Sequence, residues 1–257
     1  LVCCWDNDWR PAWRVELLPT YKAHRVVAEV PAGPDVEEVP DPLEVQVPII
    51  LEVLDAFGIC VRGADGYEAD DVIGTLATHD GGPVDIVTGD RDLFQLVDDS
   101  RAVRVLYTAR GVGRAEVLDE AAVSAKYGIP GRAYADFATL RGDPSDGLPG
   151  VAGVGDKTAA ALITKYGSLP GLLAALDAGD TGMPAGARTK LQAARDYLEV
   201  APVVVAVAKD VPLPPYDAGI PAAPADPDRL VELSQRWGLD SPLNRVLTAF
   251  TTATASA

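Results

Sequence analysis

Three carboxylates crowd into the segment GYEADDVIG, residues 66–74, just ahead of an apolar helical pattern. Glu68, Asp70 and Asp71 fall within four positions, and like charges at that spacing repel one another. Either they are solvated at a helix start, where the helix dipole favours acids, or a bound cation relieves their repulsion. Taken alone, the segment favours the helix start.

Acidic residues also follow two other predicted strands. Asp6 comes after LVCCW, and Asp90 and Asp92 come at and after the end of VDIVTG. Each could be a helix cap or a turn residue on its own. Because ligands of an open α/β sheet bind beyond the carboxyl ends of its strands, we expect these acids to converge on one edge. Asp143 and Asp146, in RGDPSDGLPG, are turn residues or close this site from the other side.

The available side chains narrow the chemistry. The two histidines, His24 and His79, lie in unrelated contexts, which argues against a histidine zinc site and against Ser-His-Asp catalysis. The three cysteines show no metal or disulfide spacing, which indicates reduced thiols in the cytoplasm. A set of carboxylates alone suits hard divalent cations, Mg²⁺ or Mn²⁺. Two such ions, ~4 Å apart, are what in-line phosphodiester cleavage uses.

A glycine-rich segment, LPGVAGVGDKTAAALI, spans residues 148–163. It is a near miss to a nucleotide P-loop, because Asp156 intervenes after Gly155 and no strand precedes the motif. The alternatives are a structural turn between helices and a helix–hairpin–helix element that grips nucleic-acid backbone through N–H groups at a helix start. In the latter, the DNA-binding candidates are Gly153, Gly155, Lys157 and Thr158.

A basic, aromatic segment, RPAWRVELLPTYKAHR, spans residues 10–25. Cations interleaved with aromatics suit contacts with phosphates and bases, but a solvated basic surface over core aromatics is equally consistent. The net charge of −16 argues against polyanion binding, although bound cations and local basic patches weaken that objection. The DNA-binding candidates here are Arg10, Arg14 and Tyr21.

The elements that must position these residues fall into two groups. Strands are expected over 1–5, 59–62, 84–88 and 103–107, alternating with helices over 45–57, 67–79 and 92–97, which predicts a parallel α/β sheet with helices on both faces. Helices are then expected over 119–127, 133–140, 158–166, 169–176 and 187–200; residues 203–208 could be a strand or continue the last helix. A proline-rich connector, a helix over 228–237 and the low-complexity tail TTATASA end the chain. The longest apolar run is too short to cross a membrane, so no membrane partner is expected.

These motifs together resemble the flap endonuclease / 5′→3′ exonuclease family, which includes the 5′-nuclease domain of bacterial DNA polymerase I. The matching segments, which fall within residues 1–207, are WD (5–6), YKAHR (21–25), GYEADD (66–71), TGDRDLFQLV (88–97) and GDPSDGLPGVAGVGDKTA (142–159). The resemblance implies a PIN/5′-nuclease-like core over 1–118 with an arch over about 9–45, and an all-helical helix–hairpin–helix domain over 119–210. Residues 211–257 would be a proline-rich extension with a short helix and a tail.

The resemblance also implies roles for single residues. One metal would be served by Asp6, Glu68, Asp70 and Asp71, and the other by Asp90, Asp92, Asp143 and Asp146. Lys22 and Arg25 on the arch would act on the scissile phosphate. A potassium ion would be bound by the backbone carbonyls of Leu140, Arg141, Pro149, Val151 and Val154. The family's first strand, which carries another metal-site aspartate, has no counterpart here, so further sequence is expected before Leu1.

The leading hypothesis is a monomeric, metal-dependent 5′→3′ exonuclease and 5′-flap endonuclease with a two-metal mechanism, acting on flaps, branches or nicked duplex ends in DNA replication or repair. It would stand alone and not form part of a polymerase. Two alternatives stay open. One is a PIN-type ribonuclease, against which the hairpin motif speaks. The other is a branched-DNA-binding protein with impaired catalysis, because the first strand is lacking.

Overall fold

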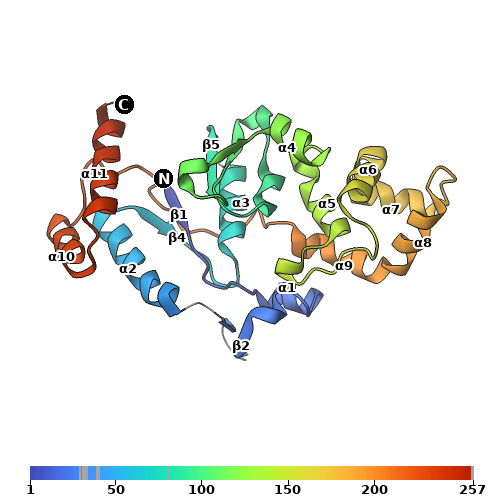
Figure 1. Ribbon diagram of the computed structural model, residues 1–257, viewed down its shortest axis with the longest axis horizontal. Coiled ribbons are helices and arrows are strands. Elements are labelled where there is room, and N and C mark those ends of the chain that lie inside the picture. Colours follow the sequence, from blue (N-terminus) through green and yellow to red (C-terminus); the bar gives the residue numbers. More distant parts are fainter. Residues whose placement is uncertain (29, 31–33, 39–40, 80, 256–257) are drawn as a thin grey trace.

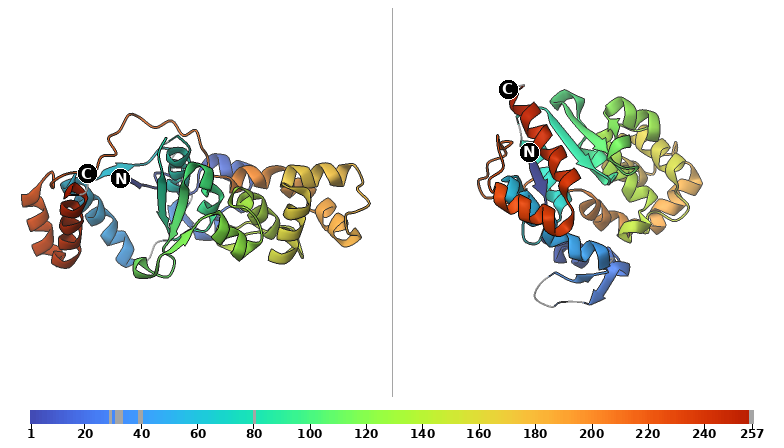
Figure 2. Two further views of the ribbon diagram at one scale, coloured as in Figure 1. Left: turned by 90° about the horizontal axis from the view of Figure 1, so that it is seen from above. Right: turned by 60° about the vertical axis from the view of Figure 1, so that its left-hand side comes forward.

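The computed structural model describes residues 1–257 except 29, 31–33, 39–40, 80 and 256–257. The molecule is elongated, and three groups of elements follow one another along its long axis (Figures 1 and 2). Helices α2, α10 and α11 form one end, the strands and α3 lie in the middle, and helices α6–α8 form the other end. The acidic motifs therefore fall in the middle of the molecule, next to the helical end that carries the hairpin.

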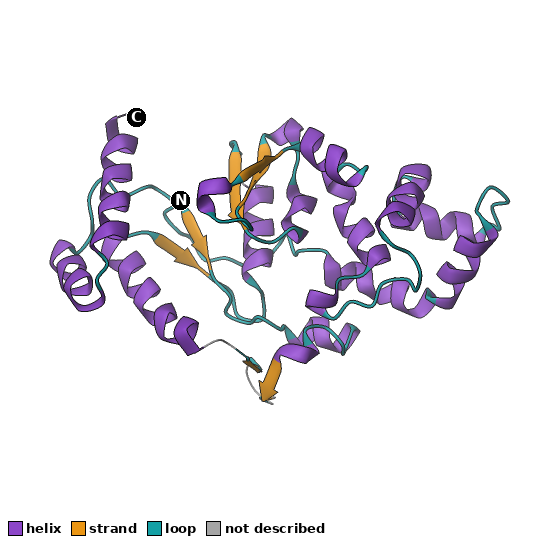
Figure 3. Cartoon of the chain, viewed as in Figure 1, coloured by secondary structure: helices purple, strands orange, loops and turns teal. Residues whose placement is uncertain are grey.

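The strands form two separate parallel pairs where one sheet was predicted (Figure 3). β1 (Val2–Cys4) pairs with β4 (Cys60–Arg62), and β5 (Val84–Thr88) pairs with β6 (Val103–Tyr107). The four predicted strands are confirmed, but β1 and β5 are not hydrogen-bonded to each other in the described chain. The short strand β7 (Glu116–Leu118), which was not predicted, adds an antiparallel edge beside β6.

Helix α3 (Ala69–His79) packs against both β1 and β5 and so joins the two pairs of strands. Two carboxylates cap its start. The Asp71 carboxylate accepts a hydrogen bond from the Glu68 backbone N–H at 3.1 Å, as in a capping box, and Asp6 accepts one from the Ala69 N–H at 2.6 Å. Part of the acidic crowding in residues 66–74 is thus explained by helix capping.

The predicted arch contains several short elements and no single long helix. They are α1 (Ala12–Leu17), the 3₁₀ turn η1 (Ala23–Arg25), the antiparallel ribbon of β2 (Val26–Ala28) and β3 (Val36–Glu37), and the start of α2 (Asp41–Phe57). The proline-rich, acidic segment 31–42 includes β3, and parts of that segment lie outside the described residues. α2 contains Pro48, yet it continues to Phe57 as the periodicity predicts.

The helical domain follows the prediction with one correction. The segment 187–200, expected as one helix, is two helices, α8 and α9, which meet at Ala194, and residues 203–205 belong to α9.

The helices of the helical domain are α4 (Glu120–Tyr127), α5 (Tyr134–Arg141), α6 (Asp156–Tyr166), α7 (Leu169–Asp177), α8 (Ala185–Ala193) and α9 (Arg195–Val205). The 3₁₀ turns are η2 (Asp92–Leu96), η3 (Asp99–Arg101), η4 (Val112–Arg114), η5 (Gly131–Ala133) and η6 (Pro144–Asp146). Among the described helices none could cross a membrane on its own; only α6 and α7 taken together, bent by 78°, have the length and apolarity.

The end of the chain corrects the predicted tail. After α10 (Pro227–Trp237), residues Asp240–Ala255 form helix α11. α2, α10 and α11 share a small core in which the rings of Phe57 and Phe250 meet edge to face, 5.5 Å apart. A larger, continuous core runs from β5 and β6 through α5 to α9. β5, which precedes Asp90 and Asp92, therefore shares one core with the helical domain.

Candidate active site

Carboxylates from three places in the chain line one small cavity of about 30 Å³. Glu68 and Asp70 come from the start of α3, Asp90 and Asp92 follow β5, and Asp146 ends η6. The predicted convergence of the acids is therefore observed for these five residues. The volume matches the space of a single water molecule and is far below that of an organic-ligand pocket.

The surroundings of these acids favour their neutral forms. Burial raises the pKa of Asp70 well above its ordinary range, and the charges of Asp90 and Glu68 raise it further. Burial, together with the charges of Asp90 and Asp146, raises the pKa of Asp92 to about 8. Burial also raises the pKa of Asp146, although the charges of Lys22 and Arg25 oppose the change. A positive charge in the cavity would relieve this repulsion.

Asp92 shows most directly that the cavity fits a cation. Its Oδ1 atom is buried and has no hydrogen-bond partner among the described residues. A buried carboxylate oxygen without a partner costs free energy unless a cation or a water molecule contacts it. Nonetheless, within the described residues no three Asp, Glu, His or Cys side chains lie close enough to enclose an ion as they stand. Two of the carboxylates, Glu68 and Asp146, are instead paired with basic side chains.

Lys22 is one of these basic side chains, and it lines the cavity. Its Nζ atom donates to the Glu68 carboxylate and, at 3.3 Å, to the Trp9 carbonyl. Burial alone would lower the pKa of Lys22, but the charges of Glu68 and Asp146 outweigh it and raise the pKa. Its backbone adopts a left-handed conformation, φ 47, which is uncommon for a residue with a side chain and is typical of functional sites.

Arg25 pairs with another of these acids, Asp146. Its guanidinium donates to the Asp146 carboxylate at 3.0 Å and to the Ser145 carbonyl. The Lys22 backbone N–H also donates to the Asp146 carbonyl at 2.9 Å. Gly147 permits this approach, because its φ is +70 and a Cβ atom there would lie 2.1 Å from the Thr20 carbonyl oxygen. The segment 20–25 is thus held against the motif GDPSDG.

Asp71 and Arg14 form a buried ion pair, which bears on the predicted metal-ligand role of Asp71 and the predicted DNA contact of Arg14. Asp71 is fully buried and does not line the cavity; its two oxygens accept hydrogen bonds from both terminal nitrogens of Arg14, each at 2.7 Å. Arg14 is 2% exposed and also binds Glu68 at 2.7 Å and the Val204 carbonyl at 3.0 Å. A buried, paired guanidinium does not support the predicted DNA contact of Arg14, which stays a prediction. The predicted ligand role of Asp71 is not supported, because its oxygens are already engaged.

Asp143 and Asp6 also lie outside the lining of the cavity. Asp143 is buried, and its carboxylate accepts from Arg91 at 3.0 Å, from Arg141 at 3.1 Å and from the Ser145 N–H at 3.0 Å. Burial would raise the pKa of Asp143, but the Ser145 hydrogen bonds and the charge of Arg91 outweigh it and lower the pKa. The predicted ligand role of Asp143 is therefore not supported. Asp6 is exposed and caps α3, although its charge still acts on Asp70.

The remaining arch candidates are structural. Arg10 is 7% exposed, donates to the Tyr21 carbonyl at 2.7 Å and forms an ion pair with Asp35 at 2.5 Å. Tyr21 is 3% exposed, and its hydroxyl donates to the Glu68 carboxylate at 2.7 Å. The burial of both side chains does not support the predicted DNA contacts of Arg10 and Tyr21, which stay predictions. Tyr21 and Arg14 both donate hydrogen bonds to the same carboxylate oxygen of Glu68, Oε2, and so hold its side chain in position.

The hairpin candidates lie on the surface. Val151 and Val154 are buried and anchor the turn, whereas Gly153, Gly155, Lys157 and Thr158 are exposed. Helix α6 begins after Gly155 without a side-chain cap, so N–H groups of its first turn are left for a ligand. Sequence reasoning missed Lys190 of α8, whose Nζ donates to the Gly153 carbonyl at 2.7 Å. Lys190 lies 37 positions after Gly153, so no local sequence pattern links the two residues.

The carbonyls predicted to bind potassium are partly engaged in the turn. The Leu140 carbonyl accepts from the Val151 N–H at 2.9 Å, and the Val151 carbonyl accepts from the Val154 N–H at 2.9 Å. Each carbonyl retains a second lone pair. The prediction that Leu140, Arg141, Pro149, Val151 and Val154 bind K⁺ therefore stays a prediction.

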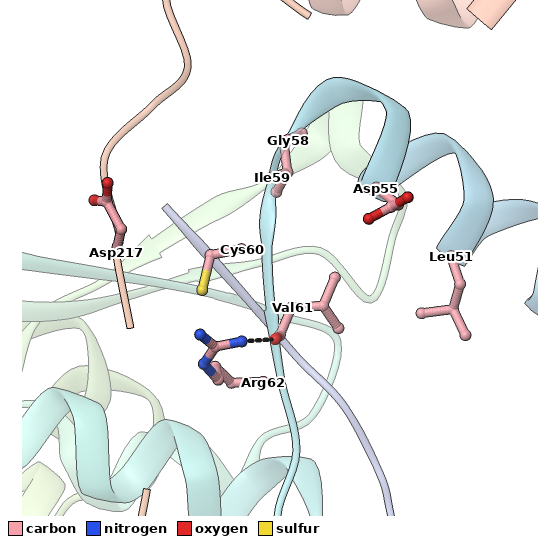
Figure 4. Close-up of a pocket in the computed structure, with 8 residues that line it drawn as sticks. All are labelled: Leu51, Asp55, Gly58, Ile59, Cys60, Val61, Arg62 and Asp217. Carbon is pink, nitrogen blue, oxygen red and sulfur yellow. Dashed lines mark hydrogen bonds between the residues drawn. The ribbon is translucent and has the colours of Figure 1, made fainter. Parts of the chain in front are cut away.

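A larger cavity of about 500 Å³ lies beside β4 (Figure 4). It brings together two carboxylates, Asp55 of α2 and Asp217 of the connector, and Arg62, whose Nη1 donates to the neighbouring Val61 carbonyl at 2.8 Å. Its lining has neither the number of acids nor the basic residues of the smaller cavity. We therefore place the candidate active site at the smaller cavity.

An α/β core with carboxylates gathered at its strand ends, packed against an exposed helical hairpin, defines a class of phosphodiester-cleaving nucleases. Comparison with known families agrees. Residues 1–128 match the model described as "5'-3' exonuclease, N-terminal resolvase-like domain", and residues 129–228 match "5'-3' exonuclease, C-terminal SAM fold". The chain belongs to the 5′–3′ exonuclease family.

Curated relatives support this assignment, and a solved structure shares the fold. A 5′–3′ exonuclease of Streptomyces coelicolor is 59% identical over 251 residues, which cover 98% of this chain and 83% of that protein. A 5′–3′ exonuclease of Mycobacterium tuberculosis is 53% identical, with 98% and 82% covered. The flap endonuclease of bacteriophage T5, in a pseudo-enzyme–product complex with DNA and metal ions, has a TM-score of 0.56 at 17% identity, with 76% of this chain and 70% of that chain covered. At that identity the likeness concerns the fold.

Proposed function

We propose that this protein is a divalent-metal-dependent 5′ nuclease that hydrolyses DNA at 5′ flaps and 5′ ends. The observation that carries the proposal is the cavity in which Asp70, Asp90, Asp92 and Asp146 meet, with one Asp92 oxygen unsatisfied. The complex of the phage relative with DNA and metal ions supports the same chemistry. We further propose that the protein acts as a monomer in the cytoplasm, in DNA replication or repair.

The donor set suits Mg²⁺ or Mn²⁺, because it consists of carboxylate oxygens alone. Asp70, Asp90, Asp92 and Asp146 would hold such ions, with Glu68 beside them. When bound, divalent cations would activate a water molecule as the nucleophile and would stabilise the negative charge that develops on the leaving oxygen. Lys22 and Arg25, now paired with Glu68 and Asp146, are placed to exchange these partners for the scissile phosphate and to offset its developing charge.

The hairpin would hold the duplex by its backbone. The exposed start of α6, with Lys157 and Thr158, offers N–H groups and a cation to a phosphate, and nothing in it reads bases. A potassium ion at the carbonyls of residues 140–154 would add positive charge at the same turn. Binding is therefore expected to follow duplex shape and strand ends, independent of sequence.

Cleavage of a labelled 5′-flap DNA with Mg²⁺, set against a matched RNA hairpin, tests the proposal. We expect cleavage of the DNA and none without divalent cations. Asp90→Ala should abolish cleavage and spare duplex binding, because Asp90 lines the acid cavity and follows β5, outside the hairpin segment 148–163. Preference for RNA would overturn the proposal in favour of a PIN-type ribonuclease, and binding without any cleavage would indicate a branched-DNA-binding protein.

Lys157→Ala is the complementary variant. It should weaken duplex affinity several-fold and lower the salt dependence of binding by about one phosphate contact, while single-turnover cleavage at saturating protein stays near normal. Thr164→Ala serves as the matched control, because Thr164 is an exposed residue farther along α6. An unchanged affinity of Lys157→Ala at low salt would count against the hairpin as the DNA-binding surface.

A further inference from the structure

One wall of the acid cavity is formed by the end of α9 and the residues that follow it. Val204, Val205 and Val207 line the cavity together with the carboxylates. α9 ends at Val205, so the last carbonyls of the helix have no partner within it. We call residues 204–208 the wall segment.

Side chains of other elements bind the backbone of the wall segment. The Arg14 guanidinium of α1 donates to the Val204 carbonyl at 3.0 Å and to the Ala206 carbonyl at 3.3 Å. The Asp71 carboxylate of α3 accepts a hydrogen bond from the Ala208 N–H at 2.8 Å. The position of the wall segment therefore depends on these tertiary hydrogen bonds.

Gln95 of η2 binds two further residues of the wall segment and joins them to Asp92. Its Nε2 atom donates to the Asp92 carbonyl at 2.9 Å and to the Val205 carbonyl at 3.2 Å. Its Oε1 atom accepts a hydrogen bond from the Val207 N–H at 3.1 Å. Gln95 is 7% exposed, so an apolar side chain in its place would leave these backbone groups without their partner.

The backbone of Asp92 is held on both sides, whereas part of its carboxylate is free. Gln95 binds the Asp92 carbonyl, and the Asp92 N–H donates to the Asp90 carboxylate at 2.8 Å. The Oδ1 atom of Asp92 is buried and has no hydrogen-bond partner among the described residues. A fixed main chain that presents a free carboxylate oxygen is what a metal ligand requires of its supporting residues.

We propose that Gln95 is a positioning residue, which holds the Asp92 carboxylate in place for a divalent cation by tying the Asp92 carbonyl to the wall segment. Gln95 is not among the described residues that line the acid cavity, so it acts through Asp92 and not on the substrate. The inference rests on the proposed metal site but not on DNA as the substrate.

Thr75 of α3 provides a matched control. Its hydroxyl donates to the Asp71 carbonyl at 2.9 Å and accepts from the Val211 N–H at 3.1 Å, so it also joins the carbonyl of an acid to the chain after α9. Thr75 is 5% exposed, but the acid that it holds does not line the cavity. A residue with a purely structural role should behave as Thr75 does.

The test measures the binding of Mn²⁺ to the full chain by titration calorimetry. In Gln95→Met, which keeps an unbranched side chain of similar length but lacks the amide, the dissociation constant for Mn²⁺ should rise at least tenfold. In Thr75→Val it should change less than twofold, although urea unfolding should show a loss of stability in both variants. Equal changes of affinity in the two variants, or none in Gln95→Met, would overturn the proposal.

Amide hydrogen exchange of the unaltered protein gives a second measurement should Gln95→Met fail to fold. Saturating Mn²⁺ should slow exchange of the Val207 N–H at least tenfold, because opening of its bond to Gln95 also releases Asp92. Exchange of the Val211 N–H, which Thr75 holds, should slow less than twofold. Equal slowing at both residues would mean that Mn²⁺ stabilises the whole fold and would overturn the role of Gln95.

Cleavage of flap DNA separates this inference from the proposed function. Binding of Mn²⁺ by the unaltered protein without any cleavage would overturn the proposed function, and the affinity ratio between the variants would still decide the role of Gln95. Normal cleavage together with an unchanged Mn²⁺ affinity in Gln95→Met would overturn the inference alone. Absence of Mn²⁺ binding by the unaltered protein would overturn both.

Discussion

Asp71, in the first turn of α3 after β4, and Asp92, at the start of η2 after β5, are carboxylates in equivalent positions that the structure treats oppositely. Asp71 is fully buried and satisfied, with both oxygens held by Arg14 and further N–H donors from Glu68 and Ala208. Asp92 has a buried oxygen without a partner and a pKa that burial and neighbouring charges raise to about 8. One carboxylate stabilises the fold, and the other is left available for a ligand.

The difference shows how the two kinds of acid can be separated. Burial alone does not distinguish them, because both sites are desolvated. What differs is the balance of charge: the Arg14 guanidinium offsets Asp71 and Glu68, whereas Asp70, Asp90 and Asp92 mainly face one another. Uncompensated charge held in place by a packed fold is typical of functional sites, where stability is given up for reactivity.

The strongest test of this comparison is Asp92→Asn. The amide keeps the size of the side chain but removes a charge that would bind the cation, so cleavage of flap DNA should fall at least ~10³-fold. The stability of the metal-free protein should stay equal or rise, because repulsion with Asp90 and Asp146 is relieved. Flap cleavage and urea unfolding measure the two quantities. Normal cleavage, or a clear loss of stability, would place Asp92 with the structural acids.

Asp71→Asn should show the reverse pattern. It leaves the buried Arg14 with Glu68 as its remaining carboxylate, and removing one partner of a buried ion pair costs ~3–5 kcal/mol, here toward the lower value. Urea unfolding gives the loss of stability. Cleavage per folded molecule, measured at low temperature, should fall far less than in Asp92→Asn.

Asp85→Asn is the control for an ion pair without burial. Asp85 pairs with Arg104 at 2.6 Å, but both side chains are about half exposed. Such pairs contribute little to stability, so unfolding should be almost unchanged. A similar loss in Asp71→Asn and Asp85→Asn would mean that the buried ion pair with Arg14 does not stabilise the fold as the structure implies.

The sequence predicted the positions of the acids better than their roles. The strands over 84–88 and 103–107 follow from apolar runs between turn residues, and the acids after them converge as parallel strand ends require. The pairing of Asp71 with Arg14 could not be predicted, because the two residues are 57 positions apart and no periodicity links them. The same holds for Asp143 with Arg91, which are 52 positions apart.

Elements fixed by tertiary packing were also missed. The predicted low-complexity tail begins at residue 251, yet residues 251–255 continue helix α11, in which Phe250 packs against Phe57 of α2. The break at Ala194 and the gap between β1 and β5 likewise have no local sequence signal. Local propensity is a weak guide wherever contacts between distant segments decide the structure.

A further expected effect is a dependence of stability on pH in the absence of divalent cations. The folded-state pKa of Asp92, about 8, lies above its unfolded value of ~3.9, so the folded protein binds more protons than the unfolded chain between these two values. Stability contributed by the protonated carboxyl is therefore present at pH 5 and is lost as the pH rises toward 8. For one such group the slope is at most ~1.4 kcal/mol per pH unit.

Urea unfolding between pH 5 and 8 in a chelating buffer measures this slope. Asp92→Asn should reduce it, because the amide does not titrate, and millimolar Mg²⁺ should reduce it in the unaltered protein, because a bound cation favours the ionised carboxylates. Asp71→Asn should lower stability at every pH while keeping the slope. A slope that is the same in all three proteins and insensitive to Mg²⁺ would show that the acid cavity carries no uncompensated charge, and the contrast between Asp71 and Asp92 would be lost.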